Sequence, residues 1–297
     1  MALSKDCRHI LQKFVLENKK ILIDEFRKTL EGTYGINYKT GKIEEVNTLN
    51  FENDKEFELA IMFRARIKFY ENDSEGGKID LIDRLCRELC YTILNRLVAL
   101  KIFEQKEIIL ESISSSYSSK GFILFKRVAD TSLGDSYETY KAYLISLFEE
   151  LSSLVSSIFD QQDVFSAFFP REPILLKILS EVNSESITEI LKSEESLGWI
   201  YQYFNPPEER KLMRDVSSQP RTSRELAVRN QFFTPRYIVD ELVQCTIGRL
   251  WLSKTQSPEM WISKFPKLRQ FEDDISKSEL IVPRDIRGIE PACGSRH

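Results

Sequence analysis

The sequence predicts a mainly α protein whose last quarter begins an α/β region. Three observations carry this prediction. Charged residues make up 30% of the 297 residues, while Gly (11) and Pro (10) are few, a composition typical of long amphipathic helices. Apolar residues recur every three or four positions over most of residues 1–205. Near the C-terminus a short apolar run leads into a loop of small residues, as strands do in open α/β sheets.

Helical periodicity defines the elements of the first region. The predicted helices cover residues 8–30, 55–70, 79–103, 137–159, 173–182 and 186–204. Residues 121–128 form a short apolar run and are the best strand candidate in this half. Asn205, Pro206 and Pro207 end the last helix, since proline disfavours helical backbone in the residue before it.

Residues 206–230 are polar and charged, and we interpret them as a charged linker between a helical N-terminal domain, residues 1–205, and a second region, residues 231–297. The arginines and lysine of this linker could contact DNA phosphates. Its acidic residues nearly balance them, so a solvated linker is favoured.

Charge and cysteine content restrict the class of protein. The net charge is −4 and the pI is near 5.6, so most of the surface is not expected to bind phosphates, although DNA binding is not excluded. Five scattered cysteines form no disulfide framework and suit a reducing cytoplasm. No run of about 18 apolar residues predicts a membrane span, and the first 16 residues do not resemble a signal peptide.

The last region contains a predicted helix start and a predicted strand. Thr234 offers a hydroxyl N-cap and Pro235 suits the first helical position. Apolar residues then form a stripe: Ile238, Val239, Leu242, Val243, Ile247, Leu250 and Trp251. Residues 286–290 predict a short strand that runs into Pro291, Ala292, Cys293, Gly294 and Ser295. A strand followed by small residues suits a nucleotide-like ligand, although an ordinary β-turn would give the same pattern.

Two motifs in this region resemble a known family. The string Glu290-Pro291-Ala292-Cys293-Gly294-Ser295 resembles the Asp-Pro-Ala-Cys-Gly-Ser-Gly loop of adenine-N6 DNA methyltransferases, and residues 231–239 are similar to their upstream Phe-Thr-Pro motif. Residues 84–103, 197–204 and 247–251 resemble segments of the PglX-type methyltransferases of BREX phage-defence systems, and are similar to type IIG restriction-modification enzymes.

The resemblance implies the truncated start of a Rossmann-like α/β methyltransferase domain in residues 231–297, with S-adenosyl-L-methionine as cofactor and DNA as substrate. The implied cofactor-binding residues are Phe233, Thr234, Pro235, Glu290, Pro291, Ala292, Cys293, Gly294 and Ser295. Glu290 replaces the family's Asp, a change that keeps the carboxylate. Arg296 replaces its second Gly, and a bulky residue there restricts the loop and crowds the ligand.

We assign no catalytic residue and no metal ligand. Asn205-Pro206-Pro207 matches part of the family's Asn-Pro-Pro-aromatic motif, which binds the flipped adenine, but Glu208 replaces the aromatic residue, and we interpret the tripeptide as a helix stop. Glu104 and Lys106 match the E-x-K element of restriction nucleases, but we expect a solvated helix end. Cys86 and Cys90 lack further nearby ligands and are expected to be core residues, and His9 is expected at the surface.

Two functional hypotheses follow. The first is an N-terminal fragment of a site-specific adenine-N6 DNA methyltransferase of a phage-defence or restriction-modification system, inactive alone. The alternative is a non-catalytic helical module that docks on other defence-system proteins or on DNA. A nuclease half is a third, disfavoured reading.

Overall fold

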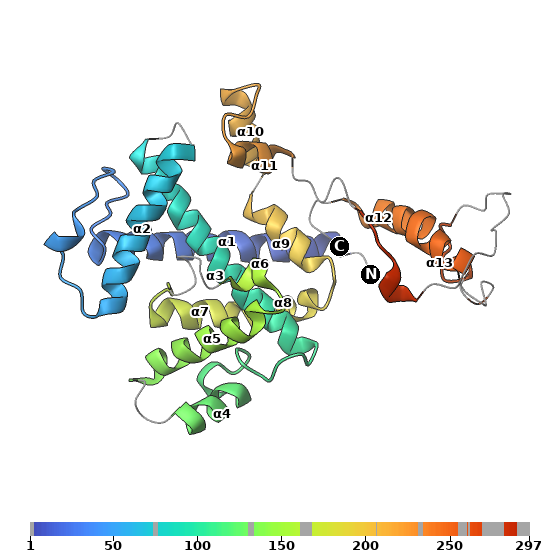
Figure 1. Cartoon of the computed structure of the whole chain (residues 1–297), viewed down its shortest axis with the longest axis horizontal. Helices are drawn as coiled ribbons and strands as arrows, with labels where there is room; N and C mark the ends of the chain where they lie inside the picture. The colour runs from blue at the N-terminus through green and yellow to red at the C-terminus, as the bar shows by residue number, and fades with distance from the viewer. Residues whose placement is uncertain are drawn as a thin grey trace. The chain divides into compact units, whose positions relative to one another are not determined.

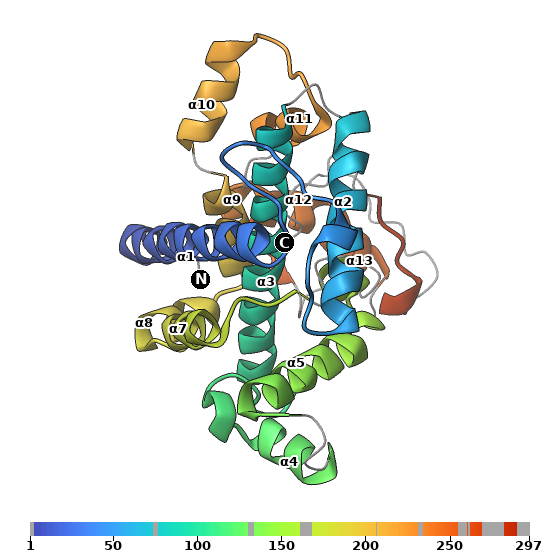
Figure 2. The same ribbon diagram turned by 90° about the vertical axis from the view of Figure 1, so that its left-hand side faces the viewer.

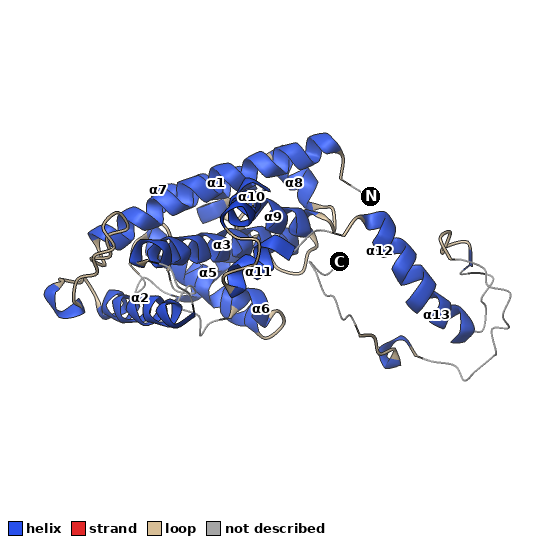
Figure 3. Cartoon of the chain, turned by 90° about the horizontal axis from the view of Figure 1, so that it is seen from above, coloured by secondary structure: helices blue, strands red, loops and turns tan. Residues whose placement is uncertain are grey.

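A computed structural model describes residues 3–73, 77–129, 134–160, 168–205, 207–230, 234–254, 260, 262–268 and 282–289. These residues form helices and loops without strands (Figure 3), with one isolated antiparallel bridge between Ile36 and Ile43. The mainly α prediction is therefore confirmed for the described part of the chain. Contacts divide the protein into a unit of residues 3–229 and a unit that starts at residue 230.

Two long helices form the centre of the first unit, and α1 (Lys5–Gly32) crosses α3 (Lys78–Gln105) in Figures 1 and 2. The Ser4 Oγ accepts a hydrogen bond from the Cys7 amide and caps α1 at 3.1 Å. The face of α1 toward the core repeats every three or four residues: Leu11, Phe14, Val15, Leu22, Phe26 and Leu30 are buried. Both helices occur where the periodicity predicts them.

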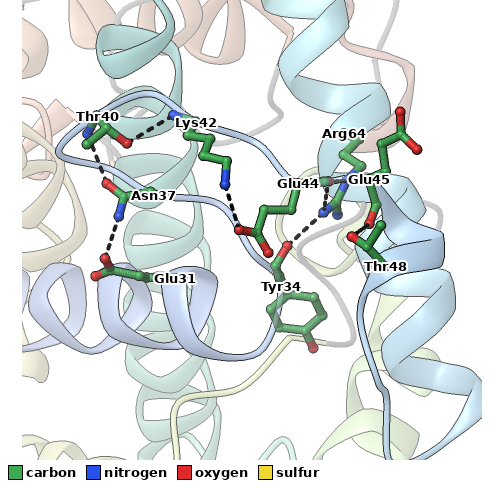
Figure 4. Close-up of polar contacts among 9 residues, drawn as sticks. All are labelled: Glu31, Tyr34, Asn37, Thr40, Lys42, Glu44, Glu45, Thr48 and Arg64. Carbon is green, nitrogen blue, oxygen red and sulfur yellow. Dashed lines mark hydrogen bonds and ion pairs between the residues drawn. The ribbon is translucent and has the colours of Figure 1, made fainter.

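The loop between α1 and α2 (Asp54–Asp73) is held by one guanidinium group. Arg64 donates to the carbonyls of Tyr34 at 2.8 Å and Glu44 at 2.7 Å (Figure 4). It also donates to the Ala60 carbonyl within α2 at 2.8 Å. The loop contains a short 3₁₀ turn, Val46–Thr48. Gly35 has a positive φ of 62°, a backbone conformation that favours glycine. The second predicted helix is confirmed as α2. The Arg64 guanidinium provides a hydrogen-bond donor to the Tyr34 and Glu44 carbonyls of the loop.

Two predictions between residues 120 and 160 are wrong. Residues 121–128 form no strand but lie in a helix, α4 (Lys120–Ala129), which follows a 3₁₀ turn, Ser116–Ser118. The centroids of the Phe122 and Tyr140 rings lie 5.0 Å apart, so α4 packs on the next helix. A short apolar run in a sequence does not distinguish a buried helix from a buried strand. The predicted helix 137–159 is two helices, α5 (Ser136–Ser152) and α6 (Ser156–Phe159).

Three further helices, α7, α8 and α9, pack against α1. The predicted helix 173–182 is confirmed as α7 (Glu172–Val182), whereas the predicted helix 186–204 is split into α8 (Glu185–Leu191) and α9 (Ser196–Phe204). An ion pair joins the buried Glu25 of α1 to the exposed Arg171, the N-cap residue of α7. Lys19 of α1 donates to the Phe204 carbonyl of α9 at 2.7 Å.

Residues 206–230, which we assign to a charged linker, contain two helices, α10 (Pro207–Val216) and α11 (Ser223–Asn230). Two of the basic side chains here are buried and bind backbone. Arg210 donates to the Asn205 carbonyl at 2.9 Å, and Arg229 donates to the carbonyls of Ser217 and Ser218. These guanidinium groups therefore stabilise the segment's own turns.

The second unit is built on one continuous helical rod. It comprises α12 (Arg236–Val243), a π-helical stretch (Gln244–Gly248) and α13 (Arg249–Lys254), and a short 3₁₀ turn (Pro283–Asp285) lies further along the chain. In neither unit do the described residues include a helix with the length and apolarity that crossing a membrane requires.

Candidate functional site

The Phe-Thr-Pro segment precedes α12, and the structure describes only part of it. Phe233 lies outside the described residues, whereas Thr234 and Pro235 are described and exposed. The helix starts one residue later than predicted, because Pro235 is itself the N-cap with an extended ψ of 136° and no side chain caps the helix. The Pro235 carbonyl accepts from the Ile238 amide at 2.9 Å. The predicted Thr234 hydroxyl cap is therefore wrong, although a helix does begin here.

Lys267 links the segment 262–268 to α12 and the π-helical stretch after it. The Lys267 ammonium lies 3.5 Å from the Asp240 carboxylate and donates to the Tyr237 carbonyl at 3.0 Å. Its backbone amide donates to the Gln244 side chain at 2.8 Å. Asp240 also accepts from Arg236 at 2.8 Å. The Asp240 carboxylate therefore pairs with two cationic side chains, those of Arg236 and Lys267.

The apolar stripe predicted for α12 and α13 is largely uncovered within the described residues. Leu242, Val243 and Ile247 expose 58%, 46% and 47% of their surface, and α12 has no buried residue. A helix with such a stripe normally buries it against another layer. No strand among the described residues of this unit packs on the stripe.

The described residues contain no strand at the predicted position, and they do not include the predicted cofactor loop. Residues 286–289 have no strand partner, and Ile289 is 94% exposed. The loop residues Glu290, Pro291, Ala292, Cys293, Gly294 and Ser295 lie outside the described residues. The described part of the chain therefore does not bring the predicted cofactor-binding residues together.

The interpretation of Asn205-Pro206-Pro207 as a helix stop is confirmed. Helix α9 ends at Phe204 with Asn205 as its C-cap, and α10 starts at Pro207. The Asn205 carbonyl accepts from Arg210. This carbonyl is therefore engaged in the turn between two helices.

Glu104 has a structural role that the sequence does not reveal. It lies at the end of α3, as expected, but its carboxylate is not simply solvated, because it accepts hydrogen bonds from the amides of Ser112 and Ile113 and from the Ser114 hydroxyl. Lys101 donates to the same hydroxyl at 2.7 Å, and burial lowers the pKa of its ammonium group. The carboxylate that matches a nuclease element is thus used to close the serine-rich loop.

The cysteines expected in the core lie there. Cys86 and Cys90 are buried, and burial raises the pKa of both thiols, that of Cys86 to about 12. No cluster of three metal-ligating side chains occurs in the described ranges. His9 is exposed, as expected.

Comparison with known proteins gives the chain relatives at low identity. It is 22% identical over 348 aligned positions to the adenine-specific methyltransferase PglX of Lacticaseibacillus casei (strain Zhang), covering 97% of this chain and 28% of that protein. It is 27% identical over 134 positions to the adenine-specific methyltransferase BrxX of Escherichia coli O9:H4 (strain HS), covering 42% of this chain and 10% of that protein.

No family model and no solved structure matches the chain. The chain spans less than a third of the length of either methyltransferase relative. The resemblance to PglX-type methyltransferases, first drawn from short motifs, is confirmed by these two similarities.

Proposed function

We propose that this chain, which is similar to adenine-specific methyltransferases of BREX systems, forms the N-terminal part of a DNA adenine-N6 methyltransferase of a phage-defence system. The observation that carries the proposal is the similarity to PglX over 97% of this chain. In this proposal residues 3–229 supply a helical domain, and α12 begins the domain that binds S-adenosyl-L-methionine.

We further propose that these 297 residues transfer no methyl group on their own. The adenine-binding motif that the family uses has no counterpart in this proposal, since Glu208 replaces its aromatic residue, α9 ends at Phe204 and α10 starts at Pro207. The exposed side chains of Leu242, Val243 and Ile247 support the same proposal, because no strand among the described residues packs on this helical rod.

The activity test is methyl transfer from labelled S-adenosyl-L-methionine to unmethylated DNA. The purified 297-residue chain is expected to give background incorporation, with the L. casei PglX protein assayed beside it as the reference enzyme. Incorporation above background by the 297-residue chain would overturn the proposal that it is inactive alone.

Cofactor binding requires a separate test. The proposed ligand residues are Phe233, Thr234, Pro235 and the loop 290–295. Isothermal titration of the 297-residue chain with S-adenosyl-L-methionine is expected to show no saturable heat, because Arg296 crowds the loop where the family has glycine. Saturable binding that is lost in a Gly294→Val variant would show that the loop binds the cofactor despite Arg296.

A second candidate function, a docking module for other defence proteins, is favoured by one feature of the first unit. Residues 3–229 contain a continuous core of their own, so this unit has the contacts of an independent domain. The net charge of −4 makes proteins better candidate partners than DNA. Fluorescence anisotropy with labelled duplex DNA is expected to show no binding at physiological salt, and binding there would favour DNA instead.

A further inference from the structure

Helix α4 has an outer face that combines exposed aliphatic side chains with exposed basic ones. Ile123, Leu124 and Val128 expose 41%, 53% and 81% of their surface. The basic residues of the helix are exposed as well: Lys120, Lys126 and Arg127. Lys120, Leu124 and Val128 are spaced by four and form one ridge along the helix, and Ile123 and Arg127 form the ridge beside it.

The opposite face of α4 is fixed to the helical unit by aromatic rings. The ring centroids of Phe122 and Tyr140 lie 5.0 Å apart, and those of Phe125 and Tyr143 lie 5.3 Å apart. In Figures 1 and 2, α4 lies at the edge of the unit beside α5. The aliphatic residues of the outer face take no part in the core that the described residues form. The helix is therefore held in place by one face, and its other face is presented to the surroundings.

The basic residues of α4 have no carboxylate partner among the residues that the structure describes. The helix itself contains no acidic residue, and the nearest described acidic residues in the sequence bind other groups. Glu111 accepts from the Ser115 hydroxyl. Asp135 caps α5 by accepting from the Glu138 amide at 2.9 Å, and the Glu138 carboxylate lies 2.8 Å from the Lys141 ammonium. A helix with three positive charges thus stands out in a chain whose net charge is −4.

The combination of charge and apolar surface restricts what this face can bind. A second copy of α4 would bring three cations against three cations in either orientation, which like-charge repulsion opposes. A DNA backbone would neutralise the cations, but it would bury Leu124 and Val128 against phosphates. An anionic lipid surface attracts clusters of about four to eight basic residues, and the aromatic side chains that would enter it, Phe122 and Phe125, face the core instead.

We propose that the outer face of α4 binds an amphipathic helix of a partner protein, one with an aliphatic strip and carboxylates along its edges. Ile123 and Leu124 lie in the middle of α4, while Lys120 precedes them and Arg127 follows. An aliphatic strip covers the middle, and the carboxylates pair with the cations at both ends. This proposal rests on the second candidate function, the docking module, and names its docking face and the chemistry of its partner.

The contact is small, so the affinity should be modest. Helix α4 has 10 residues, and a single pair of helices buries less than the roughly 1,200 Å² typical of stable interfaces. We expect a Kd of roughly 10–500 μM for a matching helix. The probe is a fluorescein-labelled peptide of three Glu-Leu-Ala-Glu-Glu-Leu-Glu heptads, which places leucines on one side of a helix and carboxylates beside them.

Fluorescence anisotropy of this peptide, titrated with the 297-residue chain, is the primary test. Saturable binding is expected for the peptide, and none is expected for a control peptide with Lys in place of every Glu. A second control peptide with Gln in place of every Leu should bind at least about tenfold more weakly, because it cannot cover the aliphatic residues. No saturable binding of the first peptide up to about 1 mM protein would overturn the proposal.

Variants of the chain locate the binding face. The double variant Lys126→Glu, Arg127→Glu and the double variant Leu124→Ser, Val128→Ser should each weaken peptide binding about tenfold or more. Lys55→Glu, Lys68→Glu reverses two exposed charges of α2 and is the matched control, which should bind within about twofold of the original chain. Full binding by either α4 variant would overturn the assignment to this face. An unchanged far-ultraviolet circular dichroism spectrum shows that each variant has folded.

Two further probes separate the proposed partner from other anionic surfaces. Vesicles of phosphatidylcholine and phosphatidylglycerol should not sediment the chain, and sedimentation that is lost in Lys126→Glu, Arg127→Glu would replace the protein partner with a lipid surface. Duplex DNA at physiological salt tests the docking module itself. DNA binding there would overturn that candidate function, whereas failure of the peptide without DNA binding would overturn only the face proposed on α4.

Discussion

The ion pair between Glu25 and Arg171 should contribute measurably to stability. The Glu25 side chain is 3% exposed and accepts from the Arg171 Nε at 2.6 Å, from its Nη2 at 2.8 Å and from its backbone amide at 3.2 Å. Removal of one partner from a fully buried pair costs about 3–5 kcal/mol. Arg171 is 66% exposed and returns to water, so Glu25→Gln is expected to cost only about 1–2 kcal/mol.

Urea unfolding followed by circular dichroism gives the change in free energy of unfolding. The matched control is Glu189→Gln, which breaks the pair with Lys192 in which both side chains are more than half exposed, and a change below about 0.5 kcal/mol is expected. If Glu25→Gln were as stable as the original chain, the ion pair would contribute nothing.

The same pair predicts a pH dependence. Hydrogen bonding to Arg171 lowers the pKa of Glu25 in the folded protein. The contribution is therefore present above the unfolded pKa, about 4.3, and is lost as the pH falls through the folded value. The stability difference between the original chain and Glu25→Gln should be constant from about pH 6 to pH 7 and should shrink below about pH 4. A difference that grew on acidification would contradict the reasoning.

Three further predictions concern the first unit. A Cβ on Gly121 would lie 2.1 Å from the Tyr143 hydroxyl, so Gly121→Ala should lower the free energy of unfolding by about 1–3 kcal/mol, whereas Gly32→Ala, with no atom within 4 Å, should not lower it. Arg64→Met leaves loop carbonyls without a donor and should cost about 1–3 kcal/mol in urea unfolding and speed proteolysis of residues 33–53. Cys86, with its raised thiol pKa, should resist a thiol reagent at pH 8 until urea is added, and rapid labelling of the native protein would show that it is accessible.

The sequence predicted the long helices well, because their apolar residues repeat over many turns. Helices α1, α2, α3 and α7 begin and end within three residues of the predicted bounds. The breaks inside the predicted helices 137–159 and 186–204 contain no proline or glycine to mark them. Ser153 donates its hydroxyl to the Glu150 carbonyl after α5, a local competition with the helix that spacing alone does not reveal.

The sequence predicted which short motifs belong to the candidate site, but it did not predict how they are arranged in space. Thr234 and Pro235 do precede a helix, but the spatial relation of that helix to the loop 290–295 depends on a sheet that the described residues do not contain. The role of Glu104 was also hidden, because its partners are backbone amides eight and nine positions away. Hydrogen bonds to the backbone leave no residue-type pattern in a sequence.

The serine-rich loop closed by Glu104 has a consequence for dynamics. The Ser112 carbonyl accepts from the hydroxyls of Ser119 and Tyr140, both at 2.9 Å, while the Ser112 amide donates to Glu104. The amide protons of Ser112 and Ile113, which both donate to Glu104, should therefore exchange with solvent as slowly as those of a helix, although the segment is irregular and polar. Residues 112–119 resemble a flexible linker in composition, yet a tag or fluorescent protein inserted there would break the contacts of this loop with Glu104 of α3 and Tyr140 of α5.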